Sequence, residues 1–126
     1  MTSPRPTDAE LAILGVLWSR GPSTVRQVQD VLNEQRATGY TTVLKLLQIM
    51  TEKGLVVRDE RARTHVYEAA SSEAQTQKQL VADLLDRVFD GSAAKLVLQA
   101  LSAGKTTPAE LAEIRKLLDK HRGGRK

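Results

Sequence analysis

Several polar side chains between residues 40 and 63 carry groups that suit contact with double-stranded DNA. Threonine offers a methyl group to thymine or a hydroxyl to a base or phosphate, lysine binds guanine or phosphate, and glutamine pairs with adenine. A tyrosine at the start of this stretch can donate to a phosphate or cap the protein core, and both interpretations are open. The candidate DNA-contacting residues are Tyr40, Thr41, Thr42, Lys45, Gln48, Arg61 and Arg63.

Most of these side chains need one helix to present them together, and residues 40–53 have the spacing of a helix. When each residue is given 100°, the apolar and polar side chains separate onto opposite faces. Thr41, Lys45 and Gln48 share the polar face. Gly54 is expected to end the helix, because glycine tolerates a positive φ. The apolar face consists of Val43, Leu46, Leu47 and Met50.

The two arginines require a different element, a short β-hairpin. Residues 55–58 and 64–67 are predicted to be its strands, with Arg61 and Arg63 at or near the tip. Arg58 has Glu60 and Glu68 as alternative ion-pair partners. A polar helix followed at once by a basic hairpin predicts a winged helix, in which the helix fits a major groove and the wing reaches the phosphate backbone.

Two capping boxes mark the helices that precede the polar helix. Thr7 with Glu10 opens the first helix, and Thr24 with Gln27 opens the second. Residues 36–39 form the turn into the third helix, with Thr38 or Gly39 as its N-cap. Residues 23–24 can also add a very short strand to the wing, which the sequence alone does not decide. The winged-helix domain is predicted to occupy residues 1–69.

After residue 69 the pattern predicts three helices and no strand, so the fold class is mainly α. Each helix has an apolar stripe, yet three short helices make a poor core alone, and a second copy of the chain would complete it. The alternative is that these stripes pack on the N-terminal domain of the same chain. Residues 70–126 are therefore predicted to be a dimerisation domain. The candidate dimerisation residues are Leu80, Leu84, Val88, Leu101, Leu111, Ile114, Leu117 and Leu118.

Composition argues against several other classes of protein. The chain of 126 residues has no cysteine, which excludes disulfides and thiolate metal sites, and no 18-residue apolar run, which argues against membrane insertion. Aromatic residues make up 3%, too few for stacked single-stranded bases. His65 and His121 are too far apart to suggest a metal site. We expect a cytoplasmic protein without a cofactor, and not an enzyme.

The net charge of +4 is less informative than its distribution. Residues 1–69 hold 9 basic and 8 acidic side chains, and residues 70–126 hold 10 basic and 7 acidic ones. Much of the excess therefore belongs to the C-terminal tail with Arg122, Arg125 and Lys126, which we expect to be a solvated, disordered end. The arginines of the hairpin and Lys45 are the stronger indication of DNA binding.

Five short motifs of the chain are informative beyond the winged-helix pattern. The most specific is the stretch 85–92, Leu-Asp-Arg-Val-Phe-Asp-Gly-Ser, which a generic winged helix has no reason to carry. The other motifs are Glu10-Leu11 with Leu17-Trp18, Thr41-Thr42-Val43, Lys53-Gly54-Leu55, and Arg63-Thr64-His65-Val66-Tyr67. With these motifs, the chain resembles the penicillinase repressor family of bacteria (BlaI/MecI-type, related to the copper-responsive CopY repressors) over about residues 7–120.

The resemblance implies a dimeric transcriptional repressor that binds palindromic operator DNA and controls β-lactam resistance or related stress genes. It also implies a membrane-bound sensor protease as a partner, which cleaves such repressors within the fifth helix and releases the dimer from DNA. The position that resembles the Asn-Phe cleavage site of the family is Gln99-Ala100. This different bond, and the absence of the Cys-x-Cys pairs of copper-responsive members, leave the inducing signal open.

Two further functions remain compatible with the residues. A winged helix can bind a protein partner after DNA binding has been lost, and the near-neutral N-terminal half motivates this alternative. A DNA-binding activator, or a regulator that responds to a metabolite, is the other possibility.

Overall fold

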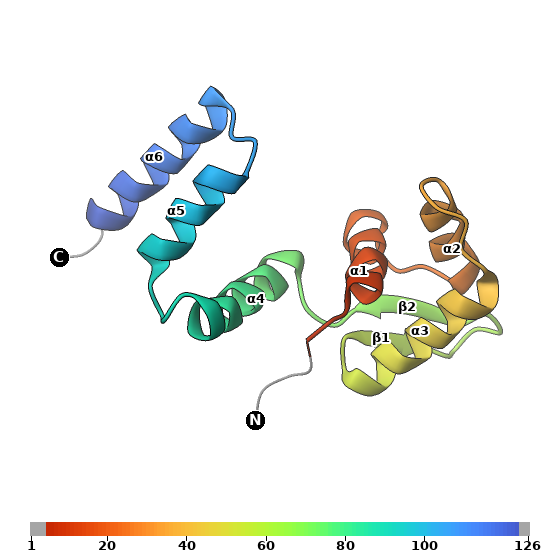
Figure 1. Cartoon of the computed structure of the whole chain (residues 1–126). Coiled ribbons are helices and arrows are strands. Elements are labelled where there is room, and N and C mark those ends of the chain that lie inside the picture. Colours follow the sequence, from red (N-terminus) through yellow and green to blue (C-terminus); the bar gives the residue numbers. More distant parts are fainter. Residues whose placement is uncertain (1–4, 124–126) are drawn as a thin grey trace. The chain divides into compact units, whose positions relative to one another are not determined.

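The computed structural model describes residues 5–123. Two compact units divide the chain inside the fourth helix, one ending at Val81 and the other beginning at Ala82. The elements, in chain order, are α1 (Asp8–Arg20), α2 (Val25–Asn33), α3 (Tyr40–Lys53), β1 (Val56–Asp59), β2 (Val66–Ala69), α4 (Glu73–Val88), α5 (Ala93–Ala103) and α6 (Pro108–Gly123) (Figure 1). The predicted mainly helical fold, with a small wing between two sets of three helices, is confirmed.

Helices α1 to α3 and the wing enclose the buried core of the N-terminal unit. Ile13 comes from α1, Val28 from α2, and Leu47 from α3, and all three are fully buried. Tyr67 from β2 joins them, as expected for a residue at the base of the wing. Burial of one such side chain stabilises the fold by about 1.5–3 kcal/mol. Trp18 is half-buried at the edge of this core.

The helix boundaries follow the capping signals in the sequence. The Thr7 hydroxyl accepts from the Glu10 backbone N–H, and the Glu10 carboxylate accepts from the Thr7 backbone N–H, which completes the first capping box. Thr24 and Gln27 form the second box in the same way. Gly39, not Thr38, is the N-cap of α3.

The wing begins later along the chain than the sequence pattern predicted. Helix α3 ends at Gly54, which has a φ of 81°, and the Leu55 N–H donates to the Met50 carbonyl. Because Leu55 completes the helix cap in this way, β1 starts at Val56. Its antiparallel partner runs from Val66 to Ala69, so the prediction of a second strand at residues 64–67 was wrong by two residues. Residues 60–65 form the loop instead.

A third short segment joins the wing, which settles the alternative that the sequence left open. The Ser23 N–H donates to the Tyr67 carbonyl at 2.9 Å, and the Tyr67 N–H donates to the Ser23 carbonyl at 2.8 Å. Both residues are buried. The loop between α1 and α2 therefore holds the wing at its base.

Turn residues and side-chain caps bound helices α4 to α6. Asp90 and Gly91 have positive φ values of 51° and 75° between α4 and α5. The Ser92 hydroxyl accepts from the Lys95 N–H at the start of α5, and the Thr107 hydroxyl accepts from the Glu110 N–H at the start of α6. Local sequence signals thus place each helix.

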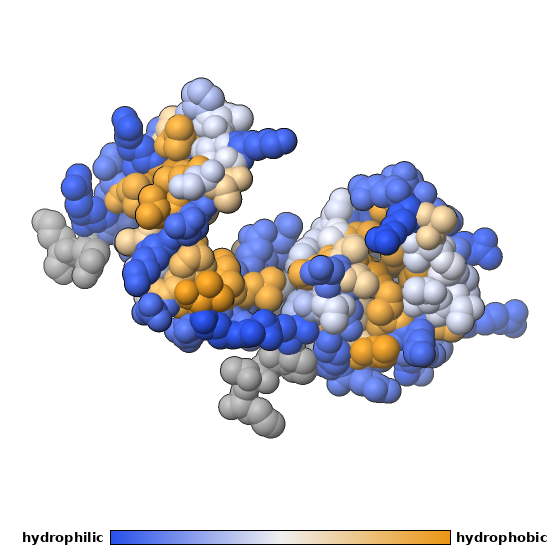
Figure 2. Space-filling model, in the orientation of Figure 1, coloured by the Kyte–Doolittle hydropathy of each residue, from blue (hydrophilic) through white to orange (hydrophobic). Residues whose placement is uncertain are grey.

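The C-terminal helices have apolar side chains but no buried core. None of residues 73–122 is buried. Figure 2 shows apolar side chains gathered over the surface of these helices. Within residues 5–123, no helix combines the length and apolar character that a membrane crossing needs. Of the predicted basic tail, Arg122 lies in α6, whereas Arg125 and Lys126 are outside the described residues.

Candidate nucleic-acid interface

The exposed face of α3 presents the polar side chains that the sequence singled out. Val43, Leu47 and Met50 are fully buried on the opposite face and fix the rotation of the helix about its axis. A hydroxyl, an ammonium and an amide group therefore point away from the core over nearly two turns. The exposed polar residues of this face are Thr41, Thr42, Lys45 and Gln48.

Tyr40 begins α3 and lies outside the buried core. Its side chain is 45% exposed, so it does not cap the core. The guanidinium carbon of Arg26 lies 6.0 Å from the centre of the Tyr40 ring, at the outer limit of a cation–π contact. The start of α2 and the start of α3 thus bring a guanidinium group near an aromatic ring.

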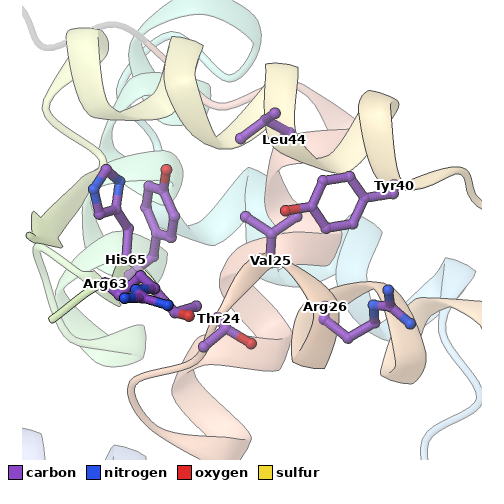
Figure 3. Close-up of a pocket in the computed structure, with 9 residues that line it drawn as sticks. Thr24, Val25, Arg26, Tyr40, Leu44, Arg63 and His65 are labelled. Carbon is purple, nitrogen blue, oxygen red and sulfur yellow. The ribbon is translucent and has the colours of Figure 1, made fainter.

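A notch of about 290 Å³ lies between α2, α3 and the wing (Figure 3). Arg26 borders it from the first turn of α2, Thr24 from the N-cap of that helix, and Tyr40 from α3. Arg63 and His65 border it from the wing loop. Two arginines, one from α2 and one from the wing loop, border this notch together with the start of α2. Since the first amides of a helix also favour anions, the notch can attract phosphate.

Three residues of the notch were missed by the sequence analysis: Thr24, Arg26 and His65. The sequence indicates Thr24 as a cap or part of a short strand, and His65 as part of a family motif and not as a metal ligand, but it indicates neither residue as a phosphate contact. Arg26 carried a usable signal, because it lies in the first turn of a helix that immediately precedes the polar helix. Its proximity to Tyr40, 14 positions later, required the structure.

Arg61 projects from the wing but is already paired. Its Nη2 lies 2.7 Å from Asp59 Oδ2, and its Nε lies 3.0 Å from Asp59 Oδ1. The Arg61 backbone N–H donates to the same Oδ1 at 3.0 Å. Hydrogen bonds from the Arg61 side chain and then its backbone lower the pKa of Asp59 to about 2, so this carboxylate stays charged at neutral pH.

The other two wing arginines differ in their surroundings. Arg58 Nη2 lies 2.7 Å from Glu60 Oε2, so Glu60 is its partner rather than Glu68. Hydrogen bonding to Tyr67, and then to Glu60, raises the pKa of Arg58. Arg63 is exposed and makes no ion pair with the part of the chain that the structure describes.

A partly buried ion pair fixes α3 from its other end. Lys53 Nζ lies 2.7 Å from Glu10 Oε1, and Glu10 is 2% exposed. Burial alone raises the pKa of Glu10, but hydrogen bonds from Lys53 and Thr7, with the charge of Lys53, bring that pKa below its ordinary value. This ion pair thus holds the C-terminal end of α3 against the start of α1.

The remaining predicted residues lie in the C-terminal helices. Leu80 and Ile114 are half-buried, whereas Val88, Leu117 and Leu118 are more than 60% exposed. Leu84, Leu101 and Leu111 are also exposed. Gln99 and Ala100, the candidate cleavage position, are exposed in the middle of α5. Among residues 5–123, no three histidine or carboxylate side chains are grouped as a metal site would need.

The sequence matches the family model described as Penicillinase repressor over residues 6–120, most of the chain. The chain belongs to the penicillinase repressor family. Its members are transcriptional repressors, so the family assignment also supports the prediction that the chain is not an enzyme.

Individual members of the penicillinase repressor family show the same relationship. The chain is 35% identical to the transcriptional regulator BlaI of Mycobacterium tuberculosis over 92 residues, 72% of this chain and 67% of that protein. It is 23% identical to the penicillinase repressor of Bacillus licheniformis over 123 residues, 98% of this chain and 96% of that protein. The resemblance inferred from the short motifs is confirmed.

A solved structure of a penicillinase repressor supports the fold. The solution structure of monomeric Bacillus licheniformis BlaI in complex with the blaP half-operator has a TM-score of 0.50 and 23% sequence identity. The match covers 58% of this chain and 89% of that chain. At this identity the likeness bears on the fold alone.

Proposed function

We propose that this protein is a transcriptional repressor that binds palindromic operator DNA as a homodimer. The observation that carries the proposal is the two-sided character of α3. A fully buried apolar face fixes the helix, and an opposite face offers Thr41, Lys45 and Gln48 to a partner. The width of the DNA major groove admits one α-helix, and these side-chain types match the donor and acceptor patterns of base edges.

The notch beside α3 supplies the phosphate contacts in this proposal. Arg26 and Arg63 are its cations, and the Tyr40 hydroxyl is a further donor. Contacts to phosphate fix the register of a protein on the duplex without reading sequence. One phosphate held between α2 and the wing would align the polar face of α3 with the base edges.

The homodimer is supported by the apolar surface of the C-terminal helices. Leu84, Leu111 and Leu117 are 43%, 46% and 61% exposed, and the helices that carry them bury no side chain. Exposed apolar surface of this kind marks an interaction site. A second copy is the partner that suits a palindromic site, because two-fold protein symmetry matches two half-sites.

Inactivation by proteolysis within α5 is the regulatory part of the proposal. The Gln99–Ala100 bond lies in the helix interior, and the Ala100 carbonyl accepts from the Gly104 N–H at 3.0 Å. A protease binds its substrate as an extended strand, so α5 must open locally before cleavage. A membrane-bound sensor protease is the proposed agent, and genes for β-lactam resistance or a related stress response are the proposed targets.

Fluorescence anisotropy with DNA from the upstream region of its own gene tests the proposal directly. We expect tight, salt-dependent binding that resists random competitor duplex, with two protomers per site. Lys45→Ala should weaken this binding and lower the salt slope by about 1, whereas Lys78→Ala in α4 removes an equal charge elsewhere and should not. Binding equal to that of random duplex, without salt dependence, would instead favour a winged helix that serves a protein partner.

A further inference from the structure

The wing has no net charge, although it carries three arginines. Residues 56–69 contain Arg58, Arg61 and Arg63 together with three carboxylates, Asp59, Glu60 and Glu68. A DNA-binding wing gains affinity mainly by placing cations against phosphates. Because the three carboxylates balance the charge of the three arginines, it matters which arginine is available to DNA.

Asp59 holds Arg61 with the geometry that a phosphate would offer. Its two carboxylate oxygens accept from Arg61 Nε and Nη2, and Oδ1 also accepts from the Arg61 backbone N–H. Most exposed ion pairs are weak, but a bidentate pair with an additional backbone bond is the favourable case. Only one residue separates the partners, so they meet without ordering a long loop.

Exchange of Asp59 for a DNA phosphate would be opposed by charge. Asp59 stays ionised at neutral pH and lies two residues from Arg61. If Arg61 turned to a phosphate, the carboxylate would remain close to that phosphate and repel it. Arg58 is occupied in a similar way, because it lies between Glu60 and the buried Tyr67.

Arg63 is in a different position. It is exposed, lines the notch with Arg26 and Tyr40, and makes no ion pair with the described residues. We propose that Arg63 is the arginine through which the wing contacts phosphate, and that Asp59 acts as a built-in phosphate substitute that withholds Arg61 from DNA. This inference rests on the proposed DNA-binding function.

The consequence is a limit on sequence-independent affinity. Binding to random duplex depends almost wholly on contacts to phosphate. A wing with three available arginines would strengthen binding to every duplex. A wing with one available arginine leaves a larger share of the binding free energy to the base contacts of α3, which makes Asp59 a specificity-determining residue.

Salt-dependent binding to a random duplex of about 20 base pairs tests this inference, with anisotropy as the readout. Asp59→Asn should steepen the slope of log affinity against log salt by about 0.9 and raise affinity about five- to tenfold at 0.1 M salt. Arg63→Ala should flatten the slope by about the same amount. The double variant Asp59→Ala with Arg61→Ala removes the pair without changing net charge, and it should keep the wild-type slope.

Two results would overturn the inference. An unchanged slope for Asp59→Asn would mean that Asp59 does not withhold a cation. If the double variant flattens the slope of log affinity against log salt as much as Arg63→Ala does, then Arg61 contacts phosphate although it is paired with Asp59. The wild-type protein separates this failure from that of the proposed function, because a wild type without salt-dependent binding to any duplex contradicts DNA binding itself.

Discussion

Lys53 in the last turn of α3 lies 2.7 Å from Glu10 in the first turn of α1, with the ammonium group against a carboxylate that is almost fully buried. The pair joins residues 43 positions apart. Glu10 also accepts from the Thr7 backbone N–H, so one carboxylate caps α1 and anchors α3. Helix α3, the proposed DNA-reading helix, is therefore coupled to the start of the chain's first helix.

Glu10→Gln should destabilise the protein by about 2 kcal/mol, because the Lys53 ammonium would lose its charged partner in a partly buried position. Urea unfolding measured by circular dichroism gives the change in the free energy of unfolding. Asp8→Asn, two residues earlier on an exposed position of α1, is the matched control and should change stability far less. Equal effects of the two substitutions would contradict the anchoring role.

The same carboxylate predicts an acid-sensitive contribution to stability. The pKa of Glu10 in the folded protein lies below its ordinary value of 4.5. Its contribution is therefore fully present above pH 4.5 and is lost as the pH falls through the folded pKa. Thermal unfolding followed from pH 7 to pH 3 should show a steeper fall in Tm for the wild type than for Glu10→Gln. Parallel curves of Tm against pH for the two proteins would contradict a contribution of the ionised Glu10 carboxylate to stability.

Substitutions at two adjacent residues of α3 should affect folding and DNA recognition separately. Leu47 is fully buried, so Leu47→Ala should destabilise the domain by about 2–5 kcal/mol. Gln48 is exposed, so Gln48→Ala should leave stability unchanged and lower operator preference by about 1–3 kcal/mol. Urea unfolding and anisotropy on the same samples test both parts. A Gln48→Ala protein with normal operator preference would remove this residue from the base contacts.

Substitution of two glycines by alanine should change the stability of the protein in opposite directions. Gly15 lies in the interior of α1 with open space around it, so Gly15→Ala should stabilise the protein by about 0.5–1 kcal/mol. Gly54 also has open space, but its φ of 81° disfavours a side chain, and Gly54→Ala should destabilise by about 1 kcal/mol. Because neither substitution creates a clash, differential scanning calorimetry would isolate the backbone effect. A change in stability of the same sign for both variants would contradict this explanation.

The dimer proposal predicts a change in mass rather than in fold. Leu117→Asp places a charge on an exposed apolar position of α6 and should give monomers with weaker operator binding. Lys116→Asp introduces the same side chain about 100° further round the helix and is the control. Sedimentation velocity at micromolar concentration distinguishes the species. A monomeric wild type would contradict the proposed dimer.

Local signals in the sequence were sufficient for most of the helical architecture. The predicted bounds of α3 match the structure at both ends, since an amphipathic pattern is followed by a glycine. The boxes at Thr7 and Thr24 formed as predicted because each needs only residues three positions apart. The start of the wing was less predictable. Leu55 reads as a strand residue, yet the helix cap uses its N–H.

The candidate site could be predicted only in part. The exposed face of α3 follows from periodicity, and so does its buried face. Arg26 next to Tyr40, and the notch between α2 and the wing, depend on how three elements pack, which no local pattern encodes. The pairing of Arg61 with Asp59 depends on the path of the wing loop. If Asp59 withholds Arg61 as inferred above, a count of arginines overstates the positive charge that the wing offers to DNA.

The hydrogen bond from the Trp18 indole Nε1 to the Ser71 carbonyl, 2.9 Å long, joins the end of α1 to the segment that leads into α4. Trp18 is the sole tryptophan of the chain. All indole emission from this protein therefore arises at the junction after the wing. The fluorescence of an unlabelled sample therefore reports on the surroundings of this one side chain. A change in emission on addition of DNA or a protease would show that DNA binding or cleavage alters the structure at this junction.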